Sequence, residues 1–136
     1  MIAALLVGVF GVAGALLRFA VDSWFARRAA ALPGVSAGGA AGHAPRHWPW
    51  ATLVVNVAGC LVIGLSVGIS GRLGLPGELH TAVATGLAGG LTTFSSWTTA
   101  TIRLLSESRL GAAALNVAAN LLVGFAAAAA GIAIVS

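Results

Sequence analysis

The stretch "GLAGGLTTFSSWTTATIR", residues 86–103, is the most informative segment of this sequence. It places glycines, threonines and serines densely inside a long run that carries no charge until its last residue. In lipid every backbone polar group needs a partner within the protein, so such residues are tolerated where they pack between helices or line a wet path. The stretch therefore predicts a membrane helix that is broken near the membrane centre.

The rest of the chain has the composition of an integral membrane protein. Of its 136 residues, 59% are hydrophobic and 7% are charged, which is too apolar for a soluble domain. Crossing a hydrocarbon core of about 30 Å takes about 20 helical residues. The chain contains uncharged runs of that length, and they are continuous rather than alternating, which favours helices over a barrel. We expect an all-α membrane protein, residues 1–136, as a single four-helix domain with spans at about 1–20, 48–71, 79–102 and 110–135.

The connections between these runs predict the topology. Residues 27–49 are rich in Ala, Gly and Pro and indicate an extramembrane loop, in which solvated histidines are a better interpretation of His43 and His47 than a metal site. The other two connections are short, so neighbouring spans should be antiparallel. One side of the membrane then carries Arg27, Arg28, Arg46, Arg103 and Arg109, and the other carries Arg72. The positive-inside rule puts both termini outside, and the basic charge sets orientation rather than binding nucleic acid.

Pairs of polar residues share helix faces within two of the spans. Thr52 and Asn56 are four residues apart, as are Asn116 and Asn120. For any single one of these side chains, a hydrogen bond between helices, worth about 0.6 to 2 kcal/mol, is the default interpretation. Taken together with the broken span, they predict a narrow polar path.

The chemistry of that path favours a small anion. A break at membrane depth exposes carbonyls at one half-helix end and N–H groups at the next, which can hold a cation and an anion. Phe94 and Trp97 share a face, and their ring edges carry partial positive charge. The acids Asp22, Glu78 and Glu107 lie at span ends or in turns, which argues against proton-coupled or cation-coupled transport. An enzyme is not expected, because no nucleophile, base and orienting acid coincide at membrane depth.

Three segments resemble one known family, the Fluc/CrcB fluoride channels. "GGLTTFSSW" is similar to the family's GGxTTFSTF signature, "TLVVN" with the glycines that follow it resembles the second-helix pattern, and "GVAGALLR" resembles the first-helix pattern. The resemblance implies a fluoride-specific channel in the prokaryotic cell membrane that lets cytoplasmic fluoride escape passively and so reduces its toxicity. It also implies a dual-topology, antiparallel dimer with two pores and one structural sodium ion.

The resemblance also implies roles for individual residues. By position, the backbone carbonyls of Gly89 and Thr92 would hold the sodium ion, which is structural and is not transported. The pore lining falls to Thr52, Asn56, Phe94, Ser95, Trp97 and Asn120. Two features depart from the family pattern. Trp97 replaces a phenylalanine, and Asn116 and Asn120 stand where an aromatic and a small hydroxyl residue are expected.

Several alternatives stay open at this stage. The uneven arginine count suggests a preferred orientation, so the partner is either a second copy or an oppositely oriented homologous subunit of a heterodimer with an altered pore. A small four-helix multidrug exporter would need a membrane-embedded glutamate, which the first span lacks. A membrane scaffold would use the polar residues as glue, and the substitution Asn56→Leu would leave it intact while stopping an ion path.

Overall fold

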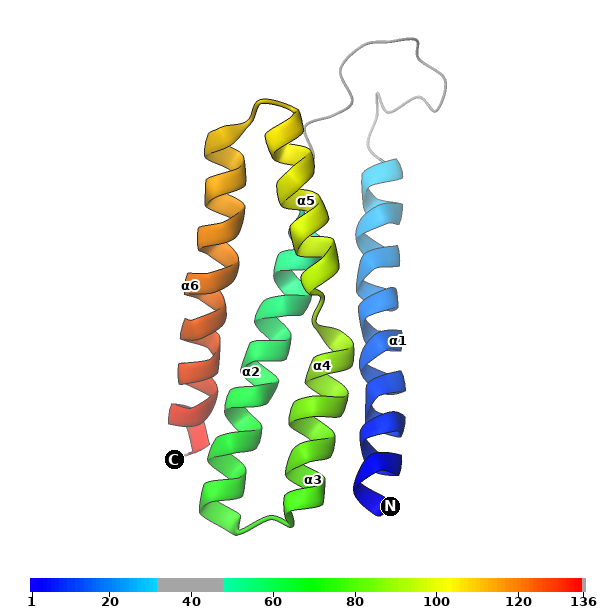
Figure 1. The fold of residues 1–136 in the computed structure, drawn as a ribbon, viewed down its shortest axis with the longest axis vertical. Coiled ribbons are helices and arrows are strands. Elements are labelled where there is room, and N and C mark those ends of the chain that lie inside the picture. The colour runs from blue at the N-terminus through cyan, green and yellow to red at the C-terminus, as the bar shows by residue number, and fades with distance from the viewer. Residues whose placement is uncertain (32–47, 136) are drawn as a thin grey trace.

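The protein is all-helical wherever its structure is described. The computed structural model describes residues 1–31 and 48–135, and every regular element in these ranges is a helix. Three helices are long: α1 (Ile2–Ala30), α2 (Trp50–Leu73) and α6 (Leu110–Val135) (Figure 1). His43 and His47, weighed above as a metal site, lie outside the described residues.

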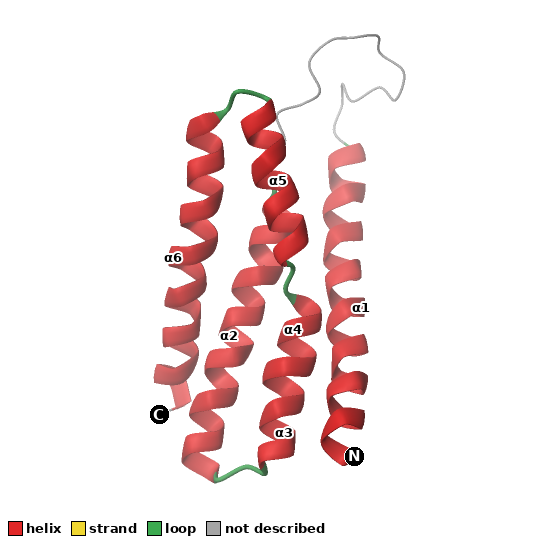
Figure 2. Cartoon of the chain, in the orientation of Figure 1, coloured by secondary structure: helices red, strands yellow, loops and turns green. Residues whose placement is uncertain are grey.

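The segment between α2 and α6 is divided into shorter pieces. It forms α3 (Gly77–Thr81), the π-helix η1 (Ala82–Leu87), α4 (Ala88–Leu91) and α5 (Phe94–Ser106). α3, η1 and α4 follow one another without a gap, whereas a short loop separates α4 from α5 (Figure 2). This interruption divides the predicted third span into two halves.

The long helices have the character of membrane spans. α1, α2 and α6 are each long and apolar enough to cross a bilayer, judged by length and composition. Many of their large apolar side chains point outward, as Leu5, Val9 and Leu122 do, with 71%, 60% and 69% of their surface exposed. Such surfaces are disfavoured in water and suited to lipid. The chain is a multi-pass membrane protein.

The helix ends follow local sequence signals. α2 ends at Gly74, whose backbone is left-handed with φ of 61°, the usual C-terminal stop. α1 continues to Ala30, well past the predicted span end at residue 20, because alanines extend it and Arg27 and Arg28 in its last turn stabilise its C-terminus. Both described ends of the chain lie at the same end of the bundle (Figure 1).

Small residues allow the helices to pack closely. Gly64 of α2 faces the backbone of Ala128 on α6, so that an added Cβ would collide with it. Small residues at such contacts let the backbones of two membrane helices approach closely. On the other side of the bundle, Gly14 of α1 meets the backbone of Leu87 and Leu91 in the same way. Gly86, Gly89 and Gly90 lie in the helical segments η1 and α4, and the helix is interrupted only after Leu91.

Candidate functional site

The site is built around an interruption of the helical backbone at Thr92 and Thr93. α4 ends at Leu91, and the next two residues are extended, with φ and ψ of −73° and 159° at Thr92 and −146° and 109° at Thr93. α5 then begins at Phe94, and the Thr93 hydroxyl accepts a 3.1 Å hydrogen bond from the Ser96 N–H. Threonine is a favoured N-cap residue, which explains why the helix restarts at this point.

Asn56 of α2 takes the place of the missing helical partners. Its Oδ1 accepts a 2.8 Å hydrogen bond from the Thr93 N–H, and its Nδ2 donates to the Thr93 carbonyl over 3.4 Å. An unpaired backbone group at membrane depth would cost several kcal/mol. One asparagine side chain therefore satisfies both backbone groups of the residue at which the helix is broken.

A chain of amides extends from Asn56 into α6. Its Nδ2 donates to Asn120 Oδ1 at 3.0 Å, and Asn120 Nδ2 in turn donates to Asn116 Oδ1 at 3.2 Å and to the Asn116 carbonyl at 2.9 Å. Asn116 Nδ2 donates to Thr101 Oγ1 at 2.9 Å, and that hydroxyl donates to the Trp97 carbonyl at 2.8 Å. Asn116 is fully buried, so its hydrogen bonds are needed to offset the loss of solvation.

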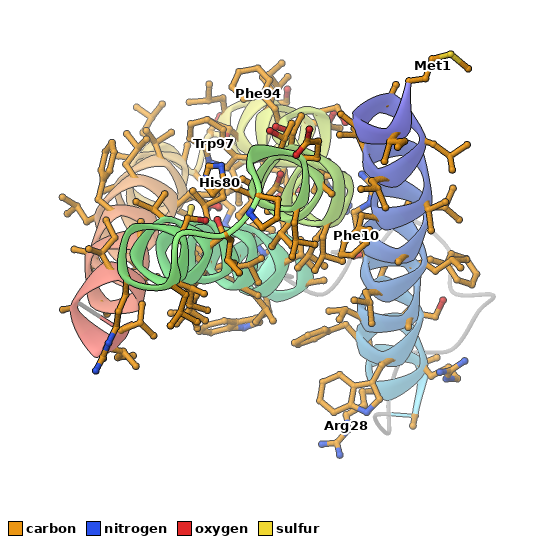
Figure 3. The ribbon with its side chains drawn as sticks, turned by 90° about the horizontal axis from the view of Figure 1, so that it is seen from below. Met1, Phe10, Arg28, His80, Phe94 and Trp97 are labelled. Atoms are coloured by element: carbon orange, nitrogen blue, oxygen red, sulfur yellow. The ribbon has the colours of Figure 1, made fainter. Side chains whose placement is uncertain are left out.

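Two aromatic rings stand beside this amide chain. The rings of Phe94 and Trp97 meet edge to face, with centroids 5.5 Å apart and planes at 71°. Trp97 is half-buried and its Nε1 donates a long, 3.4 Å hydrogen bond to the Asn116 carbonyl. Phe94 is 74% exposed and lies beside Trp97 at the outer side of the bundle (Figure 3). The shared face predicted from the spacing of the two aromatics is therefore present.

Asn56, Asn120, the interruption and the aromatic rings line a pocket of about 230 Å³. We call it the break pocket. It is lined by Asn56, Cys60, Thr92, Thr93, Phe94, Trp97, Asn120 and Leu121. The structure thus brings together four of the six predicted pore residues with one predicted sodium ligand. All the lining side chains are uncharged, and they offer N–H groups and ring edges.

Ser95, a fifth predicted pore residue, lines a different pocket. This outer pocket of about 400 Å³ is lined by Trp48, Pro49, Ser95, Ser96, Thr99, Ala100, Arg103, Leu104 and Glu107. Glu107 pairs with Arg103 at 3.0 Å and with Arg109 at 3.2 Å. The hydrogen bonds from Arg109 and Arg103 hold the pKa of Glu107 below its usual value. Charged groups therefore stand at the outer pocket, at one end of α5.

Thr52 and Gly89 lie outside both of these pockets. Thr52 is buried on α2 and lines neither the break pocket nor the outer pocket. Gly89 is exposed, and its carbonyl accepts a long, 3.5 Å hydrogen bond from the Thr92 hydroxyl, because the Thr93 N–H that would continue the helix donates to Asn56. An exposed carbonyl oxygen near a helix C-terminus suits a hard cation. In the described part of the chain, no group of three or more His, Cys, Asp or Glu side chains could hold a metal ion.

The sequence pattern did not identify two members of the site. Thr93 is one of several hydroxyl residues in its stretch, and its role depends on its backbone N–H rather than on its side chain alone. Thr101 lies one helical turn after Trp97, where a hydroxyl commonly bonds to the carbonyl four residues earlier. Its acceptor role for Asn116 requires α6 to pack against α5, which no local signal reveals.

Comparison with known proteins places the chain in a family. The family described as "CrcB-like protein, Camphor Resistance (CrcB)" matches residues 5–132. A protein of Renibacterium salmoninarum named "Fluoride-specific ion channel FluC" is 42% identical over 122 residues, which is 90% of each chain. Proteins of the same name from Pseudomonas syringae pv. tomato and Pseudomonas fluorescens are 39% identical over 127 residues and 41% identical over 125 residues. The first of these matches covers 90% of both chains, and the second covers 88% of this chain and 89% of the relative. The chain therefore belongs to the CrcB family.

Proposed function

We propose that this chain is a subunit of a fluoride-specific ion channel that lets cytoplasmic fluoride leave the cell passively and so reduces its toxicity. The observation that carries the proposal is the break pocket, where amide N–H groups and aromatic ring edges gather and every lining side chain is uncharged. The relatives named as fluoride channels, each about two-fifths identical over most of the chain, support the choice of anion.

Neutral donors suit the passage of a small, strongly hydrated anion. An ion entering the pocket loses water and needs hydrogen-bond donors in its place, whereas a fixed positive charge would bind it too tightly for release. Asn56 supplies N–H groups, and the exposed ring of Phe94 offers its positive edge in the same pocket. Arg103 lines the outer pocket beside Glu107, and no arginine lines the break pocket.

The proposed topology has four spans, with the interruption in the third near the membrane centre. In Figure 1, α3, η1, α4 and α5 together extend between the two ends of the bundle alongside α2. Thr92 and Thr93 lie between α4 and α5, away from both ends (Figure 1). Irregular backbone is tolerated at that depth where it lines a polar path, as the break pocket does.

The proposed assembly is an antiparallel dimer with a structural sodium ion at its centre. Phe94 lines the break pocket and is exposed on the single subunit, as is Gly89 nearby on the same segment, so a second subunit can cover both. The carbonyls of Gly89 and Thr92 are the residues of this chain that would hold the ion. A cation bound there by two subunits would neutralise the negative C-terminal ends of two α4 helices.

The identity of the second subunit depends on the orientation of this one. Arg27 and Arg28 end α1 at the same end of the bundle as the α5–α6 connection, which carries Arg109, while Arg72 ends α2 at the opposite end (Figure 1). This imbalance favours a fixed orientation with the arginine-rich end in the cytoplasm. A homodimer would need both orientations, and a heterodimer would need an oppositely oriented homologue.

Growth of a fluoride-sensitive bacterium tests the proposed function. A strain without fluoride export would express this chain alone, the Asn56→Leu variant at the same membrane level, or this chain with an oppositely oriented homologue. We expect the unmodified chain, alone or with the homologue, to restore growth in fluoride and the variant to fail. Growth restored equally by the variant would place the ion path away from Asn56, and failure of every combination despite normal membrane levels would indicate a scaffold rather than a channel.

A further inference from the structure

We propose that Asn116 and Thr101 are positioning residues, which fix the orientation of the Asn56 carboxamide so that an N–H group faces an anion in the break pocket. The inference rests on the proposed channel function. Asn116 and Thr101 are absent from the lining of the break pocket, so they act through the chain of amides rather than by touching the ion.

The orientation begins at the interruption of the helix. The Thr93 N–H can only donate, so Asn56 must turn its oxygen toward it, as the 2.8 Å bond shows. The Asn56 NH₂ group then faces Asn120, which must offer its own oxygen and receives a 3.0 Å hydrogen bond. At this end of the hydrogen-bond chain, the Thr93 N–H therefore favours one direction of the first two carboxamides.

The same direction continues through α6 to α5. With its oxygen toward Asn56, Asn120 turns its NH₂ group toward Asn116 Oδ1, and Asn116 in turn directs its NH₂ group at Thr101. The Thr101 hydroxyl has one proton, which it donates to the Trp97 carbonyl at 2.8 Å, so it can only accept from Asn116. The Thr93 N–H at one end and the Thr101 hydroxyl at the other therefore favour the same orientation of the three carboxamides.

With this orientation, the Asn56 group available to an anion is its Nδ2 amide rather than its oxygen. The bond from Asn56 Nδ2 to the Thr93 carbonyl is 3.4 Å long, whereas its bond to Asn120 is 3.0 Å long. The N–H group with the longer bond is the one that an anion can recruit at the smaller cost. A flipped Asn56 would instead present oxygen to the anion and repel it.

Two substitutions at Thr101 separate orientation from packing. Thr101→Val keeps the shape of the side chain and removes the acceptor for Asn116, while Thr101→Ser keeps the hydroxyl and removes a methyl group. In liposomes, fluoride efflux should fall about tenfold with Thr101→Val, the factor associated with the loss of one hydrogen bond. The Thr101→Ser variant should stay within about twofold of the unmodified protein, because its hydroxyl makes the same bonds.

The side-chain amide signal of Asn56 in NMR spectra supplies a readout independent of transport. Assigned by its loss in Asn56→Leu, this ¹⁵N–¹H signal should move or split in Thr101→Val and in a second variant, Thr101→Ala, and stay in place in Thr101→Ser. An unmoved signal in a folded Val or Ala variant, or equal behaviour of Ser and Val, would overturn the proposal. If the unmodified protein carries no fluoride, the channel function fails, and the NMR comparison still decides the orientation.

Discussion

The two halves of the segment between α2 and α6 are held in place by different chemistry. The first half, residues 77–91, packs its backbone against α1, with Gly14 and Gly90 removing the side chains that would keep the helices apart. The second half, α5, lies against α6 and is attached through hydrogen bonds of Asn116. Close backbone packing fixes where a helix lies, whereas the amide contacts also fix which way polar groups point.

This difference explains why the site lies at the junction of the two halves. The contacts of Gly14 and Gly90 hold α4 against α1. Where α4 ends, Asn56 accepts the hydrogen bond from the Thr93 N–H just before α5 begins. Substitutions in the first half should therefore disturb folding, and substitutions near the second half should disturb transport.

The largest expected effect is on folding, from a side chain added at Gly14. A Cβ there would collide with the backbone of Leu87 and Leu91, and neither helix can move without displacing the bundle. We expect Gly14→Leu to abolish the symmetric elution peak of the purified protein on size-exclusion chromatography. Gly8→Leu, on the same helix with open space around it, is the control. A normal peak for Gly14→Leu would show that α1 packs differently.

The next effect is on transport, from the loss of the Asn56 amide. Asn56→Leu leaves the Thr93 N–H without its partner and removes a donor from the break pocket, so fluoride efflux should fall by about a hundredfold or more. Stability should also decrease by about 1 to 3 kcal/mol, as for an unsatisfied buried group. Val54→Leu, on an exposed face of the same helix, should leave both properties unchanged. Efflux equal to that of the unmodified protein would place the ion path elsewhere.

A smaller effect is expected at Trp97, where the chain departs from the family signature. The 3.4 Å bond from its Nε1 is beyond the usual range, so Trp97→Phe loses little hydrogen bonding and can keep the edge-to-face pair with Phe94. Fluoride efflux of this variant should stay within about threefold of the original. A greater change in either direction would show that the indole N–H takes part in conduction.

The smallest effect is on the pH dependence of stability, from Glu107 at the α5–α6 connection. The folded pKa of Glu107 is below its usual 4.5, so its pairs with Arg109 and Arg103 contribute stability above that pH, and the contribution is lost as the pH falls through the folded pKa. Melting temperatures of the original and Glu107→Gln proteins should differ slightly at pH 7 and converge at acid pH. A constant difference across this range would exclude the ionised carboxylate as its source.

Part of the fold follows from the sequence, and part depends on how the helices pack. The continuous apolar runs of α2 and α6 predict long helices, and the hydroxyl residues after Leu91 indicate an interrupted segment. The position of the interruption was less accessible, because the glycines at 86, 89 and 90 suggest a break and instead serve contacts or open surface. The bond between Asn116 and Thr101 joins two helices and has no local signature.

The separate pocket of Ser95 could not be predicted from sequence for a related reason. Adjacent residues on a helix point in directions about 100° apart, so Phe94 and Ser95 serve different pockets although they are neighbours in the signature. Local sequence identifies which residues belong to the region. The orientation of α5 against its neighbours decides which pocket each one lines.

Anion efflux from liposomes measures whether the break pocket passes fluoride. The purified chain would be reconstituted with sodium present, and efflux followed with fluoride and chloride electrodes for the unmodified protein and Asn56→Leu. We predict rapid fluoride efflux with little chloride efflux from the unmodified protein, and loss of the fluoride signal in the variant. Equal efflux of both anions, or fluoride efflux that survives Asn56→Leu in a folded protein, would contradict the account.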